Sequence, residues 1–578
     1  MRFPSLALLA ERATQVLRRF PCTLAAGTLA AVAGIVATTK GADDVWARLA
    51  LVAALGLPVS IGLTLLAEVR GWARALRIAA LLGSIGALAL FFLAWPGIEA
   101  RHDRIRYFQL SAALHLGVAF LPFLGAGESL AFWQYNRRIF LGFLRAVVFS
   151  GVLFVGIAIA LGALDRLFGV HIEGETYGRV WLVVALVVNT WIFLATVPED
   201  LPALAQDTEY PRALKVFAQY ILTPLAFTYL IILLAYLVKI VAGAEWPSGW
   251  VGWLVASVSV TGILGFLLVH PLREDPAEGW IRSYGRWLFV GLVPAALMLL
   301  VAFCKRIAPY GLTEPRTLGL VLGLWLLAIA LLFALRSAAS IRLIPVTLAT
   351  LLLLTLYGPL SLSRVSISSQ GRRLAKLLQA GATGGVNARE ASAALRFLLD
   401  HRAGGEIAAR IGRPLPPIDW DSMPRYGGKR DSVAQQVMAL AGARYVAEYR
   451  GGGGGWFNIN SDHRVPLRVT GFEWMVPLAS GDTTVRVIDA DSVSLVSRGV
   501  NGIERIRVGS DTVQVDLRPL ARRYADSMPT TAIPADRLTI ETAGGRRARV
   551  AVTTLHGNLT GDSLRIDYWT GWVMVAPR

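Results

Sequence analysis

Charged residues and cysteines are both scarce in this chain of 578 residues. Asp, Glu, Lys and Arg make up 17% of the sequence, whereas hydrophobic residues make up 55% and the mean hydropathy is +0.54. A typical soluble domain carries about 25% charged residues. The composition therefore argues against an ordinary soluble protein of several domains, and it predicts a polytopic membrane protein with a soluble appendage.

Residues suited to catalysis or metal binding are few and scattered. Cys22 and Cys304 fall in or at the end of apolar segments, and no cysteine follows Ser363, so the second half has neither a disulfide framework nor a cysteine-based metal site. The seven histidines lack the spacing of metal ligands and support no Ser/His/Asp or Cys/His arrangement. We therefore expect no catalytic, metal or cofactor-binding residue and no cofactor, and a non-enzymatic role is favoured.

The net charge of +18 is spread evenly along the chain. Up to Ser363 there are 28 basic and 19 acidic residues, and 29 and 20 follow, so each part carries +9. Such a distribution forms no single basic arm or patch, which argues against nucleic-acid binding. Anionic lipid headgroups are the simpler partner for these arginines, and the lipid bilayer is the expected environment.

Eleven apolar segments are long enough to cross a hydrocarbon core of about 30 Å. They cover residues 20–39, 47–67, 76–95, 107–124, 139–164, 180–197, 216–241, 249–270, 287–304, 317–335 and 343–360. Each is expected to be a helix, because backbone groups in lipid must be hydrogen-bonded within the segment. Residues 2–19 predict a short amphipathic helix on the membrane surface, since Glu11 and Arg12 interrupt the apolar run that a signal peptide requires.

The orientation follows from the basic residues beside these segments. With a cytoplasmic N-terminus, the inner loops carry 17 Lys and Arg and the outer loops 11, a modest bias in the usual direction. An odd number of spans then places the C-terminal region in the periplasm, with the protein in a bacterial inner membrane. Four basic residues just after the last segment nearly remove the difference if they are counted: Arg364, Arg372, Arg373 and Lys376.

The composition changes after Ser363, which divides the chain into a transmembrane helical domain (1–363), a helical linker region (364–455) and a β-rich soluble domain (456–578). Helices are expected at 371–380, 388–400 with Asn387 as N-cap, 432–445 and 519–527. The glycine run 451–455 indicates a flexible connection, because no Lys-Ser/Thr follows it as in a phosphate-binding loop. Alternating apolar residues predict eight strands, at 467–470, 484–487, 493–496, 506–508, 513–517, 538–541, 548–552 and 564–568.

The fold class predicted from these patterns is an α-helical polytopic membrane bundle with a C-terminal soluble α+β domain. Eight short strands in about 120 residues are typical of an antiparallel sandwich or an open barrel.

A polar loop between two apolar segments holds the first candidate site: Arg306, Tyr310, Glu314 and Arg316 lie within eleven residues. One interpretation is an anion or lipid-headgroup site, since a guanidinium group suits phosphate. The favoured interpretation is a rigid turn, in which Pro309 and Pro315 fix the backbone, Gly311 permits a tight bend, and Glu314 pairs with one of the arginines.

Two polar residues within apolar segments are further candidates. His115 and Asn189 could serve a transport or proton-relay pathway, because polar groups in the hydrocarbon core are costly. They could equally make hydrogen bonds between helices. Arg145 and Lys239 lie toward the ends of their segments, where long side chains reach the headgroups, which argues against an ion-coupled pump.

Several short motifs occur in a characteristic order: 216–225 (VFAQYILTPL), 270–274 (HPLRE), 306–316 (RIAPYGLTEPR), 341–345 (IRLIP), 358–359 (GP) and 369–370 (SQ). In this order the region resembles a family of bacterial multi-pass membrane proteins called domain of unknown function 4153. The resemblance implies a membrane location, and it supplies no activity, substrate or catalytic residue.

The favoured function is thus a non-enzymatic anchor, sensor or envelope scaffold that carries an extracytoplasmic β domain. The alternative is a transporter or permease for a small or lipidic molecule, which would need a polar cavity near the membrane midplane. A cavity that reaches His115 or Asn189 would favour the alternative. A membrane-bound lipid-modifying enzyme ranks third, and it would require a cluster of carboxylates or histidines at the level of the headgroups.

Overall fold

The computed structural model of the protein describes residues 6–39, 43–98, 100–125, 129–243, 251–274, 276–336, 339–420, 428–446, 455–462, 466–482, 484–488, 491–497, 502–525, 533–543, 547–560 and 563–577. The chain forms two compact units. The first comprises Met1–Lys376 and Ala394–Leu415, and the second comprises Leu377–Ala393 and Pro416–Arg578. Each unit is described by itself.

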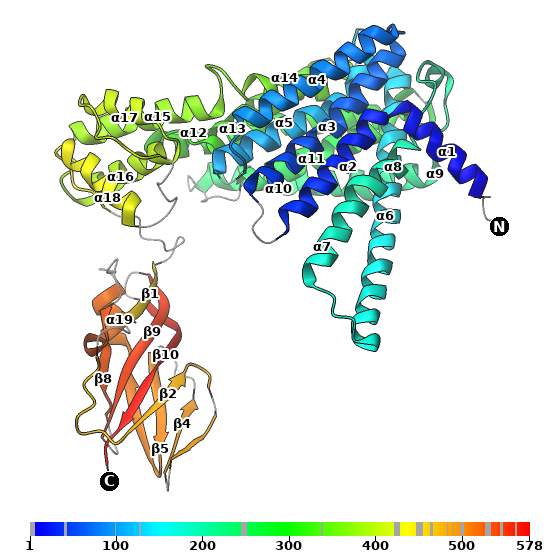
Figure 1. The fold of residues 1–578 in the computed structure, drawn as a ribbon. Helices are drawn as coiled ribbons and strands as arrows, with labels where there is room; N and C mark the ends of the chain where they lie inside the picture. The colour runs from blue at the N-terminus through cyan, green and yellow to red at the C-terminus, as the bar shows by residue number, and fades with distance from the viewer. Residues whose placement is uncertain are drawn as a thin grey trace. The chain divides into compact units, whose positions relative to one another are not determined.

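The first unit is helical (Figure 1). Its helices are α1 (Leu6–Arg19), α2 (Pro21–Ala37), α3 (Asp44–Val69), α4 (Arg74–Ala94), α5 (Arg101–Phe120), α6 (Ser129–Phe168), α7 (Gly174–Val183), α8 (Asn189–Leu194), α9 (Arg212–Val216), α10 (Thr223–Gly243), α11 (Val251–Val269), α12 (Trp280–Tyr310), α13 (Glu314–Leu335), α14 (Leu343–Leu354), α15 (Leu362–Gln379) and α17 (Gly404–Ile411). Single π-helical turns join α7 to α8 and α9 to α10. Boundaries between the units fall inside α15, after Lys376, and inside α16 (Gly385–Asp400), before Ala394.

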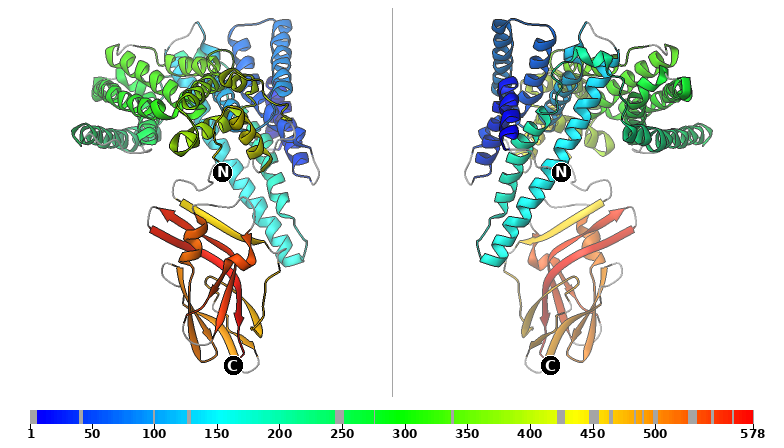
Figure 2. Two further views of the ribbon diagram at one scale, coloured as in Figure 1. Left: turned by 90° about the vertical axis from the view of Figure 1, so that its left-hand side faces the viewer. Right: turned by 90° about the vertical axis from the view of Figure 1, so that its right-hand side faces the viewer.

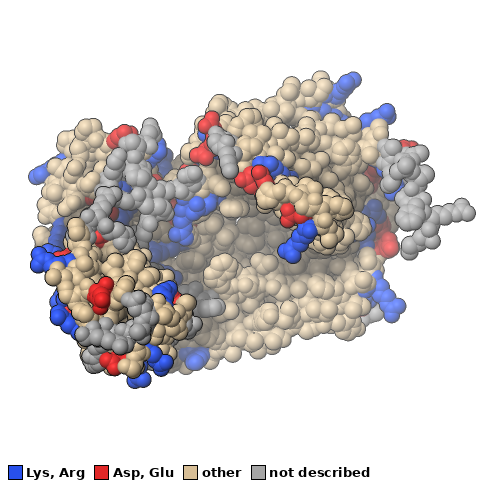
Figure 3. All heavy atoms as spheres, turned by 60° about the horizontal axis from the view of Figure 1, so that its bottom comes forward, with Lys and Arg blue, Asp and Glu red and all other residues tan. Residues whose placement is uncertain are grey.

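Eight helices among the described residues are long and apolar enough to cross a membrane, which is consistent with a membrane protein. They are Asp44–Val69, Arg74–Ala94, Ser129–Phe168, Gly174–Leu194, Arg212–Gly243, Val251–Arg273, Trp280–Tyr310 and Glu314–Leu335. A ninth is possible if Glu11–Arg19 and Pro21–Ala37, which meet at 94°, form one broken span. A wide area of the visible surface is free of charged side chains, as Figure 3 shows.

Each of the eleven predicted segments overlaps a described helix, but the predicted count of eleven spans is not confirmed. Helix α14 has 12 residues, which correspond to about 18 Å at 1.5 Å per residue, too short for a hydrocarbon core of about 30 Å. Helix α5 has 20 residues, but Arg101, Asp103, Arg104 and Arg106 occupy its first two turns and lower its hydropathy. The sequence analysis predicted these two spans from the length of an apolar segment. It did not take into account where each helix ends or which charges lie at its start.

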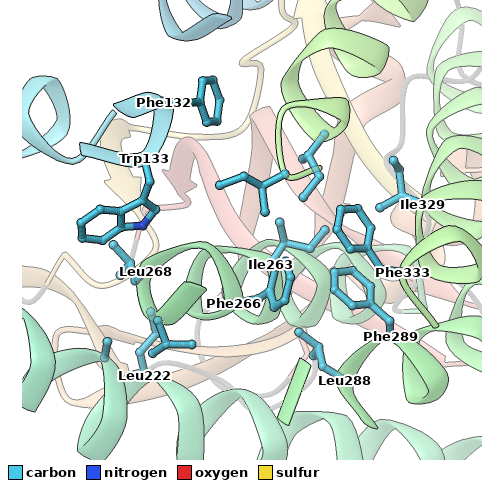
Figure 4. Close-up of a cluster of buried hydrophobic side chains, with 14 of the residues drawn as sticks. Phe132, Trp133, Leu222, Ile263, Phe266, Leu268, Leu288, Phe289, Ile329 and Phe333 are labelled. Carbon is cyan, nitrogen blue, oxygen red and sulfur yellow. The ribbon is translucent and has the colours of Figure 1, made fainter. Parts of the chain in front are cut away.

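A central part of the core of the first unit lies between α11, α12 and α13 (Figure 4). Phe266, Phe289 and Phe333 contribute one ring from each helix, with ring centroids 4.8 to 5.5 Å apart. Gly285 lets α12 approach α11, because a Cβ atom there would lie 2.9 Å from the ring of Phe266. Burial of such aromatic side chains contributes strongly to the packing of the unit.

Helix α6 is longer than its neighbours. Its 40 residues correspond to about 60 Å, and with α7 it forms a hairpin that extends beyond the other helices of the unit (Figure 2). Phe154 on α6 meets Trp181 on α7 edge to face, with centroids 5.1 Å apart. Most of the apolar side chains along α6 are exposed, as expected for a helix that faces lipid.

The second unit contains α18 (Gly428–Leu440), α19 (Arg518–Ala525) and ten strands: β1 (Gly455–Asp462), β2 (Trp474–Ala479), β3 (Arg486–Ile488), β4 (Asp491–Ser497), β5 (Ile503–Val508), β6 (Asp511–Asp516), β7 (Ile533–Pro534), β8 (Thr539–Glu541), β9 (Ala548–Thr560) and β10 (Ser563–Val575). One sheet has the order β2-β10-β9-β1-β7, with β8 also paired to β9, and the other has the order β3-β4-β5-β6. Every pair except β1 with β7 is antiparallel, which confirms the predicted fold class.

The two sheets share one core. Phe457 and Leu555 from the first sheet lie with Ile506 and Val515 from the second, and each is at most 1% exposed. The inward side chains alternate with exposed ones along β5 and β6, which is the period-two pattern visible in the sequence. The insertion predicted at 519–527 is α19, which covers the core with Leu520 and Ala521.

Several local predictions were wrong. Residues 467–470 form no strand, because they lead into a turn at Gly471, whose φ of 87° is left-handed. Strand β2 was missed since it contains Pro477, which an edge strand tolerates. Asn387 is not an N-cap, because α16 begins at Gly385, and α15 begins at Leu362, nine residues before the predicted helix. The glycines at 451–454 lie outside the described residues.

The shared core predicts that residues 456–578 fold without the helical unit. Expressed alone, this segment should be soluble and show cooperative thermal unfolding with β-type circular dichroism. Leu555→Ala should lower its free energy of unfolding by about 2 to 5 kcal/mol, because it leaves a cavity in the core. The control Val487→Ala, at a side chain 73% exposed, should change it by less than about 0.5 kcal/mol. A disordered spectrum would show that the domain needs the rest of the chain.

Candidate functional site

The candidate site surrounds the turn between α12 and α13. Helix α12 ends at Tyr310, and Gly311 follows with a φ of 67°, a left-handed conformation that glycine adopts easily. Thr313 precedes α13, and Pro315 lies in its first turn, where the missing N–H costs no hydrogen bond. Pro309 lies inside α12, so the turn itself comprises residues 311–313.

Helix α15 holds this turn from the other side. The buried amide of Gln370 donates to the carbonyls of Tyr310 and Leu312, both at 2.9 Å, and the N–H of Leu312 donates to Ser369 Oγ at 3.0 Å. Arg316 donates to the carbonyl of Gly311 at 2.9 Å. The backbone N–H and carbonyl groups of Gly311 and Leu312 are therefore all hydrogen-bonded, and the motifs 306–316 and 369–370 from the sequence lie together.

Glu314, the first residue of α13, is 3% exposed. It was expected to pair with Arg306 or Arg316, but its partner is His401, whose Nε2 is hydrogen-bonded to Glu314 Oε1. His401 lies just after α16, and its Nδ1 contacts the carbonyl of Phe397 at 2.7 Å. A carbonyl only accepts, so Nδ1 carries a proton. The bond from Nε2 to Glu314 then needs a second proton, which an imidazolium facing a carboxylate supplies.

The start of α5 completes this cluster. The ring of His102 lies 4.4 Å from that of His401, and His102 Nε2 is 3.3 Å from Asp103 Oδ2. Asp103 is 3% exposed and also accepts from Arg106 Nη1 at 3.0 Å. We call His102, Asp103, Glu314 and His401 the buried junction.

The charge state of His401 depends on its neighbours. Burial disfavours the imidazolium, but the hydrogen bond and the charge of Glu314 outweigh it, so the pKa of His401 is raised above its ordinary value. The side chains of Glu314 and His401 are 5% and 7% exposed, which shields the pair from solvent. Among the described residues, no three His, Cys, Asp or Glu side chains are grouped to hold a metal ion. The arrangement therefore suits a proton-dependent connection between helices.

Of the six residues singled out from the sequence, only Glu314 belongs to the buried junction. Tyr310 and Arg316 lie beside it, with the guanidinium of Arg316 5.6 Å from the ring of Tyr310, and Arg306 is exposed on α12. His115 is exposed, and its Nδ1 contacts the carbonyl of Ser111 within α5 at 2.8 Å. Asn189 accepts from Ser150 on α6 at 3.4 Å, a contact between helices.

The sequence analysis missed His102, Asp103 and His401. Nothing in the local pattern links His102 to His401, because 299 positions separate them. One available signal was the charged start of the segment at 101–106, since charges beside an apolar segment need partners.

These features define a protein with long apolar helices, a polar junction at one end of them, and an antiparallel β domain. The chain belongs to the family described as Domain of unknown function (DUF4153), which matches residues 25–388. This range includes His102, Asp103, Glu314 and Gln370, and it ends before His401 and the strands.

One relative is the uncharacterized protein PM1469 of Pasteurella multocida (strain Pm70), which is 23% identical over 309 residues. The match covers 53% of this chain and 51% of the relative, so the chain spans about half the length of the curated relative it matches. No solved structure matches the chain.

The buried junction predicts a pH-dependent stability. Because the pKa of folded His401 is raised, its contribution is complete below the unfolded value of about 6.5 and is lost as the pH rises through the folded pKa. The Tm of the purified full-length protein in detergent should fall over that range. His401→Gln should flatten this dependence of Tm on pH, because the side chain at position 401 then no longer titrates. The other charged or titratable groups around it, His102, Asp103, Glu314 and Asp400, are unchanged in the variant. An unchanged slope in this variant would contradict the prediction.

The turn predicts a strict requirement at Gly311. Gly311→Val should cost about 1 to 3 kcal/mol, because a β-branched residue tolerates positive φ poorly. Its Cβ would also lie 2.9 Å from Gln370 Nε2. The amount of folded protein in the membrane should fall, as measured by fluorescence-detected size exclusion. The control Gly83→Val, where a Cβ meets nothing within 4 Å, should accumulate normally. Equal amounts of the two variants would exclude a structural role for the turn.

Proposed function

We propose that the protein is a non-enzymatic membrane protein whose helical domain anchors the C-terminal β domain on the outer side of a bacterial inner membrane, as a sensor or envelope scaffold. The observation that supports this proposal is that polar contacts between the ends of the helices fall into two separate sets. The proposed domain bounds are 1–363, 364–455 and 456–578.

The first set includes the N-terminal helix. Arg19 pairs with Glu68 at the end of α3 at 2.8 Å and donates to the carbonyl of Val197 after α8 at 3.0 Å. Arg137 at the start of α6 pairs with Asp207 in the segment before α9 at 3.4 Å. Lys215 on α9 pairs with Glu278 in the segment before α12 at 2.6 Å.

The second set includes the chain after α14. Arg48 near the start of α3 donates to the carbonyl of Phe92 near the end of α4 at 2.5 Å, and Arg179 on α7 donates to Thr38 after α2 at 3.1 Å. Gln109 on α5 donates to Thr355 after α14 at 3.1 Å, and Glu314 binds His401.

In chain order the named residues alternate between the two sets from residue 19 to residue 207, after which 207 and 278 share the first set and 314 and 355 share the second. Residues 19, 68, 137, 207 and 278 belong to the first set, and residues 38, 92, 179, 314 and 355 belong to the second. The chain after Thr355 thus begins at the end of the unit opposite to α1. This argument needs no count of spans. Combined with the bias of basic residues toward the first set, it favours a cytoplasmic N-terminus and an external C-terminal domain.

The transporter alternative has less support. Among the described residues of the first unit, neither His115 nor Asn189 lines the pockets beside Arg137, beside Arg12 or beside Cys22, which have volumes of about 370 to 600 Å³. The contacts of these two residues, with Ser111 and Ser150, suit local and interhelical hydrogen bonds. The lipid bilayer is the proposed partner, and nothing in the charge distribution favours nucleic acid.

Reporter fusions test the topology. A reporter that is active only after export, fused after residue 416, should be active, and the same reporter fused after residue 200 in the first set should be inactive. A reporter that is active only in the cytoplasm should give the opposite pattern. An inactive exported reporter together with an active cytoplasmic reporter at residue 416 would overturn the proposed orientation.

A further inference from the structure

A groove with a cavity volume of about 600 Å³ runs along the first half of α6. Its residues combine guanidinium groups with apolar side chains: Arg137, Arg138, Leu141, Leu144, Arg145, Val148, Phe149, Glu209 and Pro211. We call it the α6 groove. The anchoring role described above uses the contact of Arg137 with Asp207, but it assigns no ligand to the groove.

The inner end of the α6 groove is rigidly built. Arg137, with a side chain 6% exposed, donates to the carbonyl of Glu209 at 2.9 Å and approaches Asp207 at 3.4 Å. Arg138 binds the same carboxylate at 2.7 Å. Gln134 donates to the carbonyls of Asp207 and Glu209 at 2.6 and 3.1 Å. The segment before α9 is therefore fixed on α6, and the groove exists before any ligand binds.

Arg145 lies in the same groove, seven residues beyond Arg138. This separation corresponds to about 10 Å along the helix, or two turns into the apolar segment. Its side chain is exposed, and Nε donates to the carbonyl of Leu141 at 3.3 Å, within its own helix. In the described part of the chain, no acidic side chain forms a salt bridge with Arg145. An exposed guanidinium beside apolar side chains is suited to an anionic group from outside the chain.

The charges of the α6 groove favour an anion. Asp207 is shared by Arg137 and Arg138, and Glu209 is the single acidic residue that lines the groove beside three arginines. Next to Arg145, Leu144, Val148 and Phe149 are 43%, 59% and 59% exposed and form an apolar strip. A ligand that satisfies both parts must carry a negative group and a hydrocarbon chain.

We propose that the α6 groove binds an anionic phospholipid, whose headgroup phosphate lies between Arg138 and Arg145 and whose acyl chain lies along Leu144, Val148 and Phe149. A guanidinium binds phosphate oxygens with two parallel hydrogen bonds, and the anionic lipid supplies the counter-charge that Arg145 lacks. The groove belongs to the first set of helix ends, and a cytoplasmic leaflet rich in anionic lipid would supply this ligand. The binding chemistry itself does not depend on the proposed orientation.

Native mass spectrometry of the detergent-purified full-length protein tests the proposal. Dioleoyl phosphatidylglycerol should bind the native chain, and Arg145→Gln should weaken binding about tenfold, which corresponds to the loss of one hydrogen bond to a charged group. The matched control is Arg74→Gln, at an exposed arginine outside the groove, which should bind as the native chain does. Equal affinities of Arg145→Gln and Arg74→Gln would overturn the proposal.

The ligands themselves form the second arm of this experiment. Dioleoyl phosphatidylcholine should bind several-fold more weakly than phosphatidylglycerol, and inorganic phosphate at millimolar concentration should not displace the lipid. Equal binding of the two lipids would contradict an anionic site. Displacement by inorganic phosphate would show that the groove holds a free anion, and it would overturn the role of the apolar strip.

Discussion

The hydrogen bond between Glu314 and His401 is the contact on which the arrangement of the polar end of the helical unit depends. It joins the first residue of α13 to the end of α16, two elements that are 87 residues apart in the chain. Both side chains are almost fully buried, so either group alone would be a buried charge or an unsatisfied donor. The ring of His102 on α5 and the amide of Gln370 on α15 then pack around the same place, and four helices meet there.

Polar groups throughout the helical unit follow the same constraint. Several buried groups meet a partner on another helix or segment, as Tyr135 does with the carbonyl of Val118 and Trp133 with that of Leu267. Arg145 is exposed among apolar side chains, and the proposed partner of its guanidinium is the phosphate of a lipid. This contrast separates contacts that hold the protein together from a group that is available to a lipid.

Much of the fold was predictable from the sequence. Long apolar runs identify helices because backbone groups in lipid must be satisfied within the segment, and the alternation around Val513 and Val515 identifies a strand with one buried face. The number of spans was not predictable, because α14 and α5 look apolar by composition but are too short or too charged. The turn at Gly311 was predictable as well, since glycine and proline restrict the backbone in known ways.

The partner of Glu314 was not predictable. The nearest opposite charges in the sequence were Arg306 and Arg316, and a local pairing was the natural expectation. The chain instead returns through α15 and α16 to bring His401 to it, and this return is decided by packing over the whole unit.

Hydrogen–deuterium exchange of the full-length protein in detergent tests the central role of this contact most directly. Exchange in the peptide 394–415 should be slow in the native chain and should increase several-fold in Glu314→Gln, while peptides of β9 and β10 remain unchanged. Equal protection of 394–415 in the two proteins would show that the hydrogen bond between Glu314 and His401 does not hold this segment.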